Sequence, residues 1–178
     1  MVAIVQNGNP VLRKVAVTVP EKSITSPKIQ GVLGRMKSAL DSQEDGVAIA
    51  APQIGESLRI FVVSERALDV PDDLEERKKQ PKSSGKVYGH LVFINPVMTK
   101  ISRSKALLEE GCLSVRYAYG KVRRATKASV KAWNEKGEFF TRGASGLMAQ
   151  IFQHEIDHLD GVLFIDKAID VKEVPPEK

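Results

Sequence analysis

The chain has 178 residues, 42% of them hydrophobic and 28% charged, and its formal net charge at pH 7 is +5. This composition excludes a disordered chain, and the length predicts one compact domain that spans residues 1–178. No run of about 18 apolar residues occurs, which excludes a transmembrane helix, and the basic charge alone predicts no specific nucleic-acid partner.

The first predicted elements are a helix, a loop and a strand. Residues 26–42 carry apolar side chains at helical spacing, and Ser26 followed by Pro27 predicts the start of that helix. Residues 45–55 are rich in Gly and Ala and predict a loop, whereas residues 58–63 predict a buried strand. The highly charged residues 64–86 predict an exposed excursion, with a helical turn at 72–79.

The second half of the chain predicts strands followed by a helix. Residues 88–95 and 97–102 predict two strands separated at Pro96, and residues 127–142 have the alternation and central turn of a hairpin. Residues 143–146 then lead into a helix at 147–159, which Gly161 closes. Because strands precede this helix without β–α–β alternation, we expect an α+β fold, with antiparallel or mixed sheets packed around a late central helix.

The late helix carries a pattern typical of metal-dependent hydrolases. His154 and His158 are four residues apart and share one face of the helix, so both imidazoles can bind one metal ion. Such an ion lowers the pKa of a bound water from about 16 to about 7, and the Glu155 carboxylate can take up the proton that is released. The alternative interpretation is a chance pattern on an amphipathic helix.

A catalytic site of this kind has a third protein ligand. The candidates are His90, Cys112 and an acidic residue such as Asp160. Cys112 is the only cysteine, so it cannot form an internal disulfide, and Gly111 beside it allows close backbone approach. A thiolate with two imidazoles suits iron(II), zinc, cobalt or nickel.

Three segments together resemble the signature motifs of the peptide deformylases. They are Gly46–Gln53 (GVAIAAPQ), Glu110–Ser114 (EGCLS) and Gln153–His158 (QHEIDH), and they occur in the family's order. The similarity also includes residues 9–13, 94–96 and 161–164. It covers most of the chain apart from the charged excursion and the extreme C-terminus.

This resemblance implies a single metal-dependent activity. One divalent ion, typically iron(II) with zinc, nickel or cobalt as substitutes, would be bound by Cys112, His154 and His158. A metal-held hydroxide would remove formate from the N-formylmethionine of nascent polypeptides, with Glu155 as general base and acid. The Gln53 side-chain amide and the Leu113 backbone N–H would stabilise the oxyanion.

The resemblance also implies a binding cleft for the peptide and its methionine side chain. The residues expected to form it are Gly46, Val47, Ala48, Leu108, Glu110, Gly111, Leu147, Gln150 and Ile151. Leu147, Gln150 and Ile151 lie seven, four and three residues before His154, and therefore share its side of the helix. For Leu147 and Ile151, core packing is the simpler interpretation, and the two roles are compatible.

Three positions depart from the family pattern. Ala48 stands where a second Gly is usual, Gln150 where the pocket residue is usually apolar, and Arg116 where Pro is common. The rival hypothesis is therefore a deformylase-like hydrolase with a shifted substrate preference. A different class is an RNA-binding or ribosome-binding protein with a structural metal, based on the charge of +5.

Partners and location follow from the same features. We expect N-formylmethionyl nascent peptides as substrates, transient ribosome contact, no membrane and no specific nucleic acid. The basic run 121–124 is expected to be an exposed strand end. The first seven residues lack a secretory signal and no transit peptide is seen, which predicts a cytoplasmic protein of bacterial type.

Overall fold

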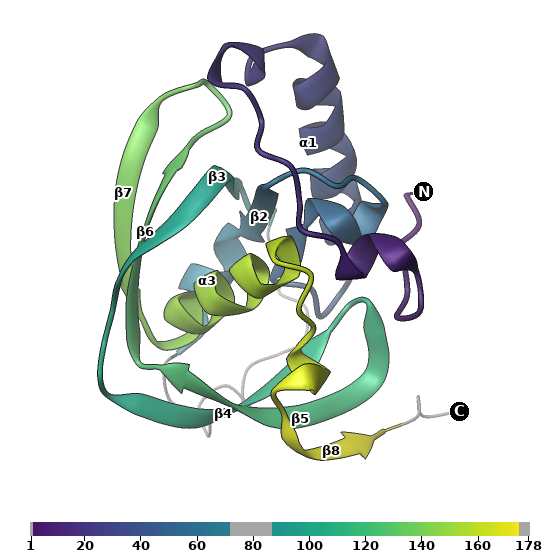
Figure 1. Cartoon of the computed structure of the whole chain (residues 1–178), viewed down its shortest axis with the longest axis vertical. Helices are drawn as coiled ribbons and strands as arrows, with labels where there is room; N and C mark the ends of the chain where they lie inside the picture. The colour runs from purple at the N-terminus through teal and green to yellow at the C-terminus, as the bar shows by residue number, and fades with distance from the viewer. Residues whose placement is uncertain (1, 72–86, 175–178) are drawn as a thin grey trace.

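A computed structural model describes residues 2–71 and 87–174 of the chain. Two antiparallel sheets pack around helix α3 (Gly146–Leu159) (Figure 1). The five-stranded sheet has the order β1 (Ala48–Ala50), β2 (Ile60–Ser64), β3 (His90–Ile101), β6 (Lys127–Trp133) and β7 (Phe139–Ser145). The three-stranded sheet has the order β4 (Lys105–Cys112), β5 (Val115–Ala125) and β8 (Ile169–Glu173). The α+β prediction is confirmed.

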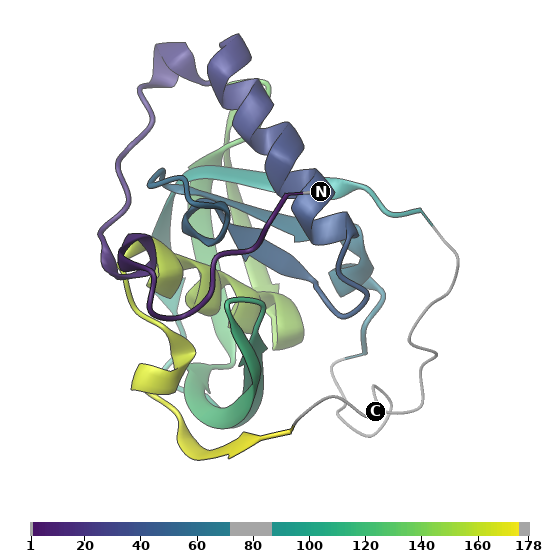
Figure 2. The same ribbon diagram turned by 90° about the vertical axis from the view of Figure 1, so that its right-hand side faces the viewer.

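Helix α1 (Pro27–Asp41) forms where the apolar spacing predicted a helix. The Ser26 side chain accepts a hydrogen bond from the backbone N–H of Ile29, and Pro27 occupies the first turn, where its missing N–H has no cost. The helix packs its buried Val32 and Met36 with inward-facing residues of the five-stranded sheet. Figure 2 shows α1 on the outer side of this sheet, away from α3.

Strand β2 is buried on both faces because a helix covers each side of the sheet. Ile60 and Val62 belong to the core that includes α1, whereas Phe61 and Val63 belong to the core that includes α3. On the α3 side, the ring of Phe61 stacks on Phe93 with centroids 4.5 Å apart. Phe152 of α3 packs against both rings, with centroids 6.3 Å from Phe61 and 5.3 Å from Phe93. Burial of each such ring contributes roughly 1.5–3 kcal/mol to folding, so this cluster holds α3 against the sheet.

Two glycines define the ends of α3. Gly146 has φ 55° and follows β7 directly, so the helix begins one residue earlier than predicted. Gly161 has φ 76°, and a Cβ at this position would lie 2.7 Å from the Arg13 carbonyl oxygen. Because a side chain here would be strained and would clash with backbone, Gly161 fixes the closing turn just after His158.

The prediction of a loop at 45–55 is wrong for its central part. Residues Ala48–Ala50 form β1, which pairs antiparallel with β2, and residues Ala51–Ile54 form a 3-10 helix, η3. Three-residue strands of small side chains carry too little alternation to be recognised from sequence. Pairing with β2, rather than local preference, makes this segment extended.

The prediction of two strands separated at Pro96 is also wrong. Strand β3 continues through this position, and its register with β6 shifts between Ile94 and Val97. Asn95 takes a positive φ of 51° there. The irregularity leaves Pro96, which has no N–H to donate, outside the regular ladder, so the strand bends instead of ending.

Strands β4 and β8 were not predicted as strands, and of β5 only a strand end at 121–124 was expected. The basic run 121–124 belongs to β5, where residues alternate between the two faces of the sheet. Lys121 and Arg123 are exposed, but Arg124 is 4% exposed. The prediction of an exposed strand end is therefore wrong for Arg124.

The remaining short elements are 3-10 helices: η1 (Pro10–Arg13), η2 (Glu21–Ser23), η4 (Glu65–Leu68) and η5 (Phe164–Asp166). The predicted helical turn at 72–79 lies outside the described residues. Within the described ranges, no helix has the length and apolar character needed to cross a membrane.

Asp166 is expected to make the stability of the protein depend on pH below about 4. Both terminal nitrogens of the Arg13 guanidinium donate to its carboxylate, and this pairing lowers the pKa of Asp166. Because the pKa of Asp166 is lower in the folded protein than in the unfolded one, the pairing stabilises the fold fully at pH values above the unfolded-state pKa. The stabilisation is lost as the pH falls through the folded-state pKa. We expect Asp166→Asn to lower the urea unfolding free energy at pH 7, with a smaller difference from the parent protein at pH 3.

Candidate metal centre

The structure brings Cys112, His154 and His158 together. Cys112 ends β4, and the two histidines lie one turn apart on α3. Figure 1 shows α3 between the five-stranded sheet and the sheet that contains β4. One ligand atom from each residue lies within 4.8 Å of the others, and Cys112 Sγ is 3.2 Å from His158 Nε2. Ligands bound tetrahedrally to a zinc-like ion stand roughly 3.5 Å apart, so the three side chains fit a metal ion.

The donor set and its surroundings favour a cation. A sulfur and two imidazole nitrogens suit borderline divalent metals. Although burial alone would lower the pKa of His154, Cys112 and Glu110 raise it well above its ordinary value, which shows that this position attracts positive charge. Burial and the nearby His154 lower the pKa of His158, which keeps that imidazole neutral, as a ligand must be.

A buried network orients His154. Its Nδ1 lies 2.9 Å from Glu110 Oε2, which leaves Nε2 as the ring atom for a metal. Glu110 in turn accepts two hydrogen bonds from Arg124, at 2.7 and 3.0 Å, and Arg124 also donates to Asp157 at 2.7 Å. Burial opposes ionisation of Glu110, but the hydrogen bonds from His154 and Arg124 lower its pKa to about 2.

Glu155 lies beside the ligands with one carboxylate oxygen free. The side chain is 3% exposed, and its Oε2 has no hydrogen-bond partner among the described residues. Burial raises the pKa of Glu155 to about 7. A carboxyl group with such a pKa can both accept and donate a proton near neutral pH.

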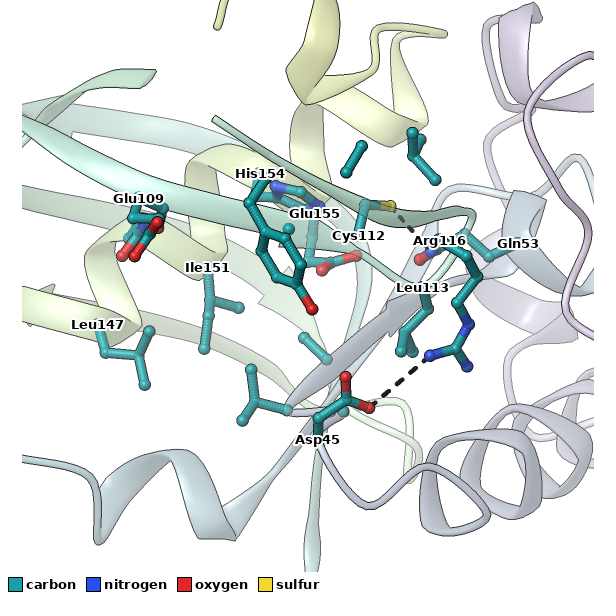
Figure 3. Close-up of a pocket in the computed structure, with 18 of the residues that line it drawn as sticks. Asp45, Gln53, Glu109, Cys112, Leu113, Arg116, Leu147, Ile151, His154 and Glu155 are labelled. Atoms are coloured by element: carbon teal, nitrogen blue, oxygen red, sulfur yellow. Dashed lines mark hydrogen bonds and ion pairs between the residues drawn. The ribbon is translucent and has the colours of Figure 1, made fainter. Parts of the chain in front are cut away.

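Gln53 faces the same site from η3 with a fixed orientation. Its Oε1 accepts a hydrogen bond from the Ala50 backbone N–H, so its Nε2 must point the other way. Nε2 donates to Ser114 Oγ at 3.1 Å and lies 3.5 Å from Cys112 Sγ. The amide nitrogen is therefore held beside the ligand set, as Figure 3 shows.

A cavity of about 380 Å³ opens onto the ligands. Figure 3 shows Leu147 and Ile151 on one side of His154 and Glu155, with Cys112 on the other. Twelve of the predicted site residues line it: Gly46, Val47, Ala48, Gln53, Gly111, Cys112, Leu113, Leu147, Gln150, Ile151, His154 and Glu155.

Some predicted residues lie elsewhere. His158 is 1% exposed and sits beneath the cavity, and Glu110 faces Arg124 rather than the cavity. Leu108, half-buried on β4, is not among the described residues that line the cavity, and its role as a pocket residue stays a prediction. The two alternative candidates for the third ligand pair with other side chains: His90 with Asp41, and Asp160 with Arg59.

The cavity also has lining residues that the sequence did not indicate. Asp45, Glu109 and the strand β5 residues Arg116, Tyr117 and Tyr119 form its mouth. Arg116 donates to Gln43 and lies 3.9 Å from Asp45 Oδ1, across the opening (Figure 3). Recognition of β5 as a strand would have placed these residues beside Cys112.

Comparisons with known proteins identify the family of the chain. The polypeptide deformylase family model matches residues 1–174. The peptide deformylase of Halothermothrix orenii is 39% identical over 166 residues, which cover 93% of this chain and 92% of that protein. The peptide deformylase of Carboxydothermus hydrogenoformans is 40% identical, with 93% and 91% covered.

Solved structures agree as well. The peptide deformylase of Thermotoga maritima matches with a TM-score of 0.76 and 32% identity, covering 95% of this chain and 98% of that one. A class I type b peptide deformylase from Acinetobacter baumannii, crystallised with Met-Ala-Ser bound, matches with a TM-score of 0.77 and 30% identity, covering 93% and 97%. The chain belongs to the polypeptide deformylase family.

Proposed function

We propose that this protein removes the formyl group from N-formylmethionyl peptides by hydrolysis of the formyl amide. The observation that carries this proposal is the cluster of three ligand atoms within 4.8 Å, with Glu155 and Gln53 lining the same cavity. Family membership supports the reaction, and the apolar Leu147 and Ile151 support a methionine-sized first side chain.

Cys112, His154 and His158 would hold one divalent ion, iron(II) by preference, with zinc, nickel or cobalt as substitutes. When bound, the ion would act as a Lewis acid and lower the pKa of water at the site. The thiolate and the neutral imidazoles suit each of these metals. The Glu110 carboxylate would keep the His154 ring turned toward the ion through the contact at Nδ1.

Glu155, Gln53 and Leu113 would act directly on the substrate. The Glu155 carboxylate, which lines the cavity, would take a proton from water and deliver it to the departing amine nitrogen. The Gln53 amide, held by Ala50 and Ser114, would donate to the oxygen of the formyl group as negative charge develops on it. The Leu113 backbone N–H, next to Cys112, would be the second donor.

The sheet edges support an extended peptide as substrate. Strand β1 is an edge of the five-stranded sheet and β4 an edge of the three-stranded sheet. Val47 and Ala48 on one side, and Glu109 and Gly111 on the other, line the same cavity. A peptide lying between these edges could pair its backbone with both, which gives affinity without dependence on sequence.

Formate release from formyl-Met-Ala-Ser tests this proposal. We expect protein purified without oxygen to contain one metal ion per chain and to release formate. A chelator should abolish the activity, and added iron(II), nickel, cobalt or zinc should restore it. Absence of formate from metal-loaded protein would overturn the proposed reaction.

The two rival hypotheses predict different outcomes. A shifted substrate preference predicts faster hydrolysis of a formylated residue other than methionine. An RNA-binding protein with a structural metal predicts salt-sensitive RNA affinity and no formate from any formyl peptide. Such a protein has no need for the Glu155 carboxylate or the Gln53 amide beside the ligands, so the site favours hydrolysis.

We further propose that residues 1–178 act as one catalytic domain on nascent polypeptides in the cytoplasm, with transient ribosome contact. The exposed Lys121 and Arg123 on β5 add to the net charge of +5 that supports such contact. Salt-dependent cosedimentation with ribosomes would test it, and cosedimentation unaffected by Lys121→Glu and Arg123→Glu would exclude this surface.

A further inference from the structure

Gln150 is a polar residue in the apolar part of the cavity. It lies on α3 one turn before His154, and its neighbours Leu147 and Ile151 are apolar. Gln150 is 6% exposed, yet it lines the cavity. An amide in this position changes the chemistry of a pocket that otherwise suits a methionine side chain.

The orientation of the Gln150 amide is fixed by its neighbours. Its Nε2 donates to the Glu109 backbone oxygen at 3.0 Å and lies 3.5 Å from Glu110 Oε1. Both neighbours are acceptors: one is a backbone carbonyl oxygen, and the other belongs to the carboxylate that accepts two hydrogen bonds from Arg124. A flipped amide would place its own oxygen against these two oxygens, so the observed orientation is strongly preferred.

The Gln150 oxygen must therefore point away from β4. It accepts no hydrogen bond from the residues described, and it is not one of the partnerless side-chain atoms that are fully buried from solvent. Since Gln150 lines the cavity, the accessible oxygen faces it. Gln150 thus presents a hydrogen-bond acceptor to the cavity at a fixed position. An apolar substrate side chain that covered this oxygen would shield it from water and leave it without a hydrogen-bond donor.

We propose that Gln150 is a specificity-determining residue, whose side-chain oxygen accepts a hydrogen bond from the first side chain of the substrate. The enzyme would then act on formylated N-termini whose side chain ends in an N–H or O–H donor, glutamine foremost, in addition to methionine. This inference rests on the proposed function, because it assigns the first side chain to the cavity beside Leu147 and Ile151.

Glutamine and methionine side chains are matched in length, which makes glutamine the best probe. Both are unbranched, and the glutamine amide occupies the place of the methionine sulfur and methyl group. The NH₂ of such a substrate can donate to the Gln150 oxygen, whereas methionine has no donor. A pocket with such an acceptor favours a side chain that carries a donor over one of equal size that lacks it, since the acceptor is otherwise left unpaired.

The experiment compares kcat/KM for formyl-Gln-Ala-Ser and formyl-Met-Ala-Ser in the metal-loaded parent protein and in Gln150→Met. The substituted side chain has the size of glutamine and no amide. We expect the ratio of the glutamine substrate to the methionine substrate to fall by about tenfold, the effect of one lost hydrogen bond. An unchanged ratio would overturn the proposal, because loss of a purely structural tie to Glu109 would affect both substrates alike.

Two controls complete the test. Ile151→Leu alters an apolar wall of the same pocket without altering its polarity, so it should change both substrates by a similar factor. If Gln150→Met does not fold, the parent protein alone gives an answer. It should hydrolyse formyl-Gln-Ala-Ser at least about fivefold better than the analogue in which a methyl ketone replaces the amide, since only the donor differs. Equal rates would contradict the proposal.

The outcome is separable from that of the proposed function. If the parent protein releases no formate from either peptide, the reaction itself is wrong. If it hydrolyses formyl-Met-Ala-Ser and the ratio is insensitive to Gln150→Met, the reaction stands and only the role of Gln150 is wrong.

Discussion

Replacement of Glu155 by glutamine is expected to lower kcat/KM for formyl-Met-Ala-Ser by about 10²–10⁴-fold, the usual contribution of a positioned general acid and base. The carboxylate lies beside the three ligand residues, and its Oε2 is buried without a partner among the described residues. An amide of the same size keeps the packing but cannot take up a proton from water. Formate release under saturating metal measures the loss.

Metal content separates this effect from damage to the site. Because Cys112, His154 and His158 are unchanged in Glu155→Gln, the variant should bind one ion per chain, as the parent protein does. Glu21→Gln is the matched control, since Glu21 is exposed and lies outside the cavity lining. Near-normal activity of Glu155→Gln with a full complement of metal would show that another group moves the proton.

The helical part of the site was predictable from local sequence. His154 and His158 are four residues apart, and any helix over 147–159 brings them to one face, whatever the rest of the fold does. The start of α1 at Pro27 was predictable for the same reason, because Ser26 caps its own helix. Such features depend on contacts within one turn.

Cys112 shows where local sequence is insufficient. It lies 46 residues before His158, and no spacing rule links a strand end to a distant helix. From the residues alone, Gly111 and the chemistry of a thiolate favoured Cys112 but left His90 and Asp160 open, and the resemblance to a known family decided between them. The structure explains the choice: the ends of β4 and α3 meet, whereas His90 and Asp160 are paired with other side chains.

Strand β5 was missed apart from its end at 121–124, because its inward positions hide the usual pattern. The residues that face the core are Ala118, Gly120, Val122 and Arg124, and one apolar branched side chain among four gives little alternation. Small residues are needed there because neighbours lie close: a Cβ at Gly120 would be 2.9 Å from Ala168 Cβ. The mouth of the cavity, formed in part by β5, was missed with it.

The burial of Arg124 was not predicted from the sequence, and it has a large expected effect. Arg124→Met is expected to lower the unfolding free energy by about 3–5 kcal/mol. The guanidinium is 4% exposed and pairs with both Glu110 and Asp157. Its removal leaves the Glu110 carboxylate, itself 3% exposed at the side chain, buried without its cation. Urea unfolding measures the loss.

Arg123→Met is the matched control, because the neighbouring Arg123 is exposed on β5 and should change stability by less than about 0.5 kcal/mol. The double variant Glu110→Gln with Arg124→Met should recover part of the loss, since it removes the unpaired charge. Arg124→Met should also weaken metal binding by about 10–100-fold, because Glu110 orients His154. Equal stability of the Arg124 and Arg123 variants would mean that the buried pairing contributes little, and that packing alone positions His154.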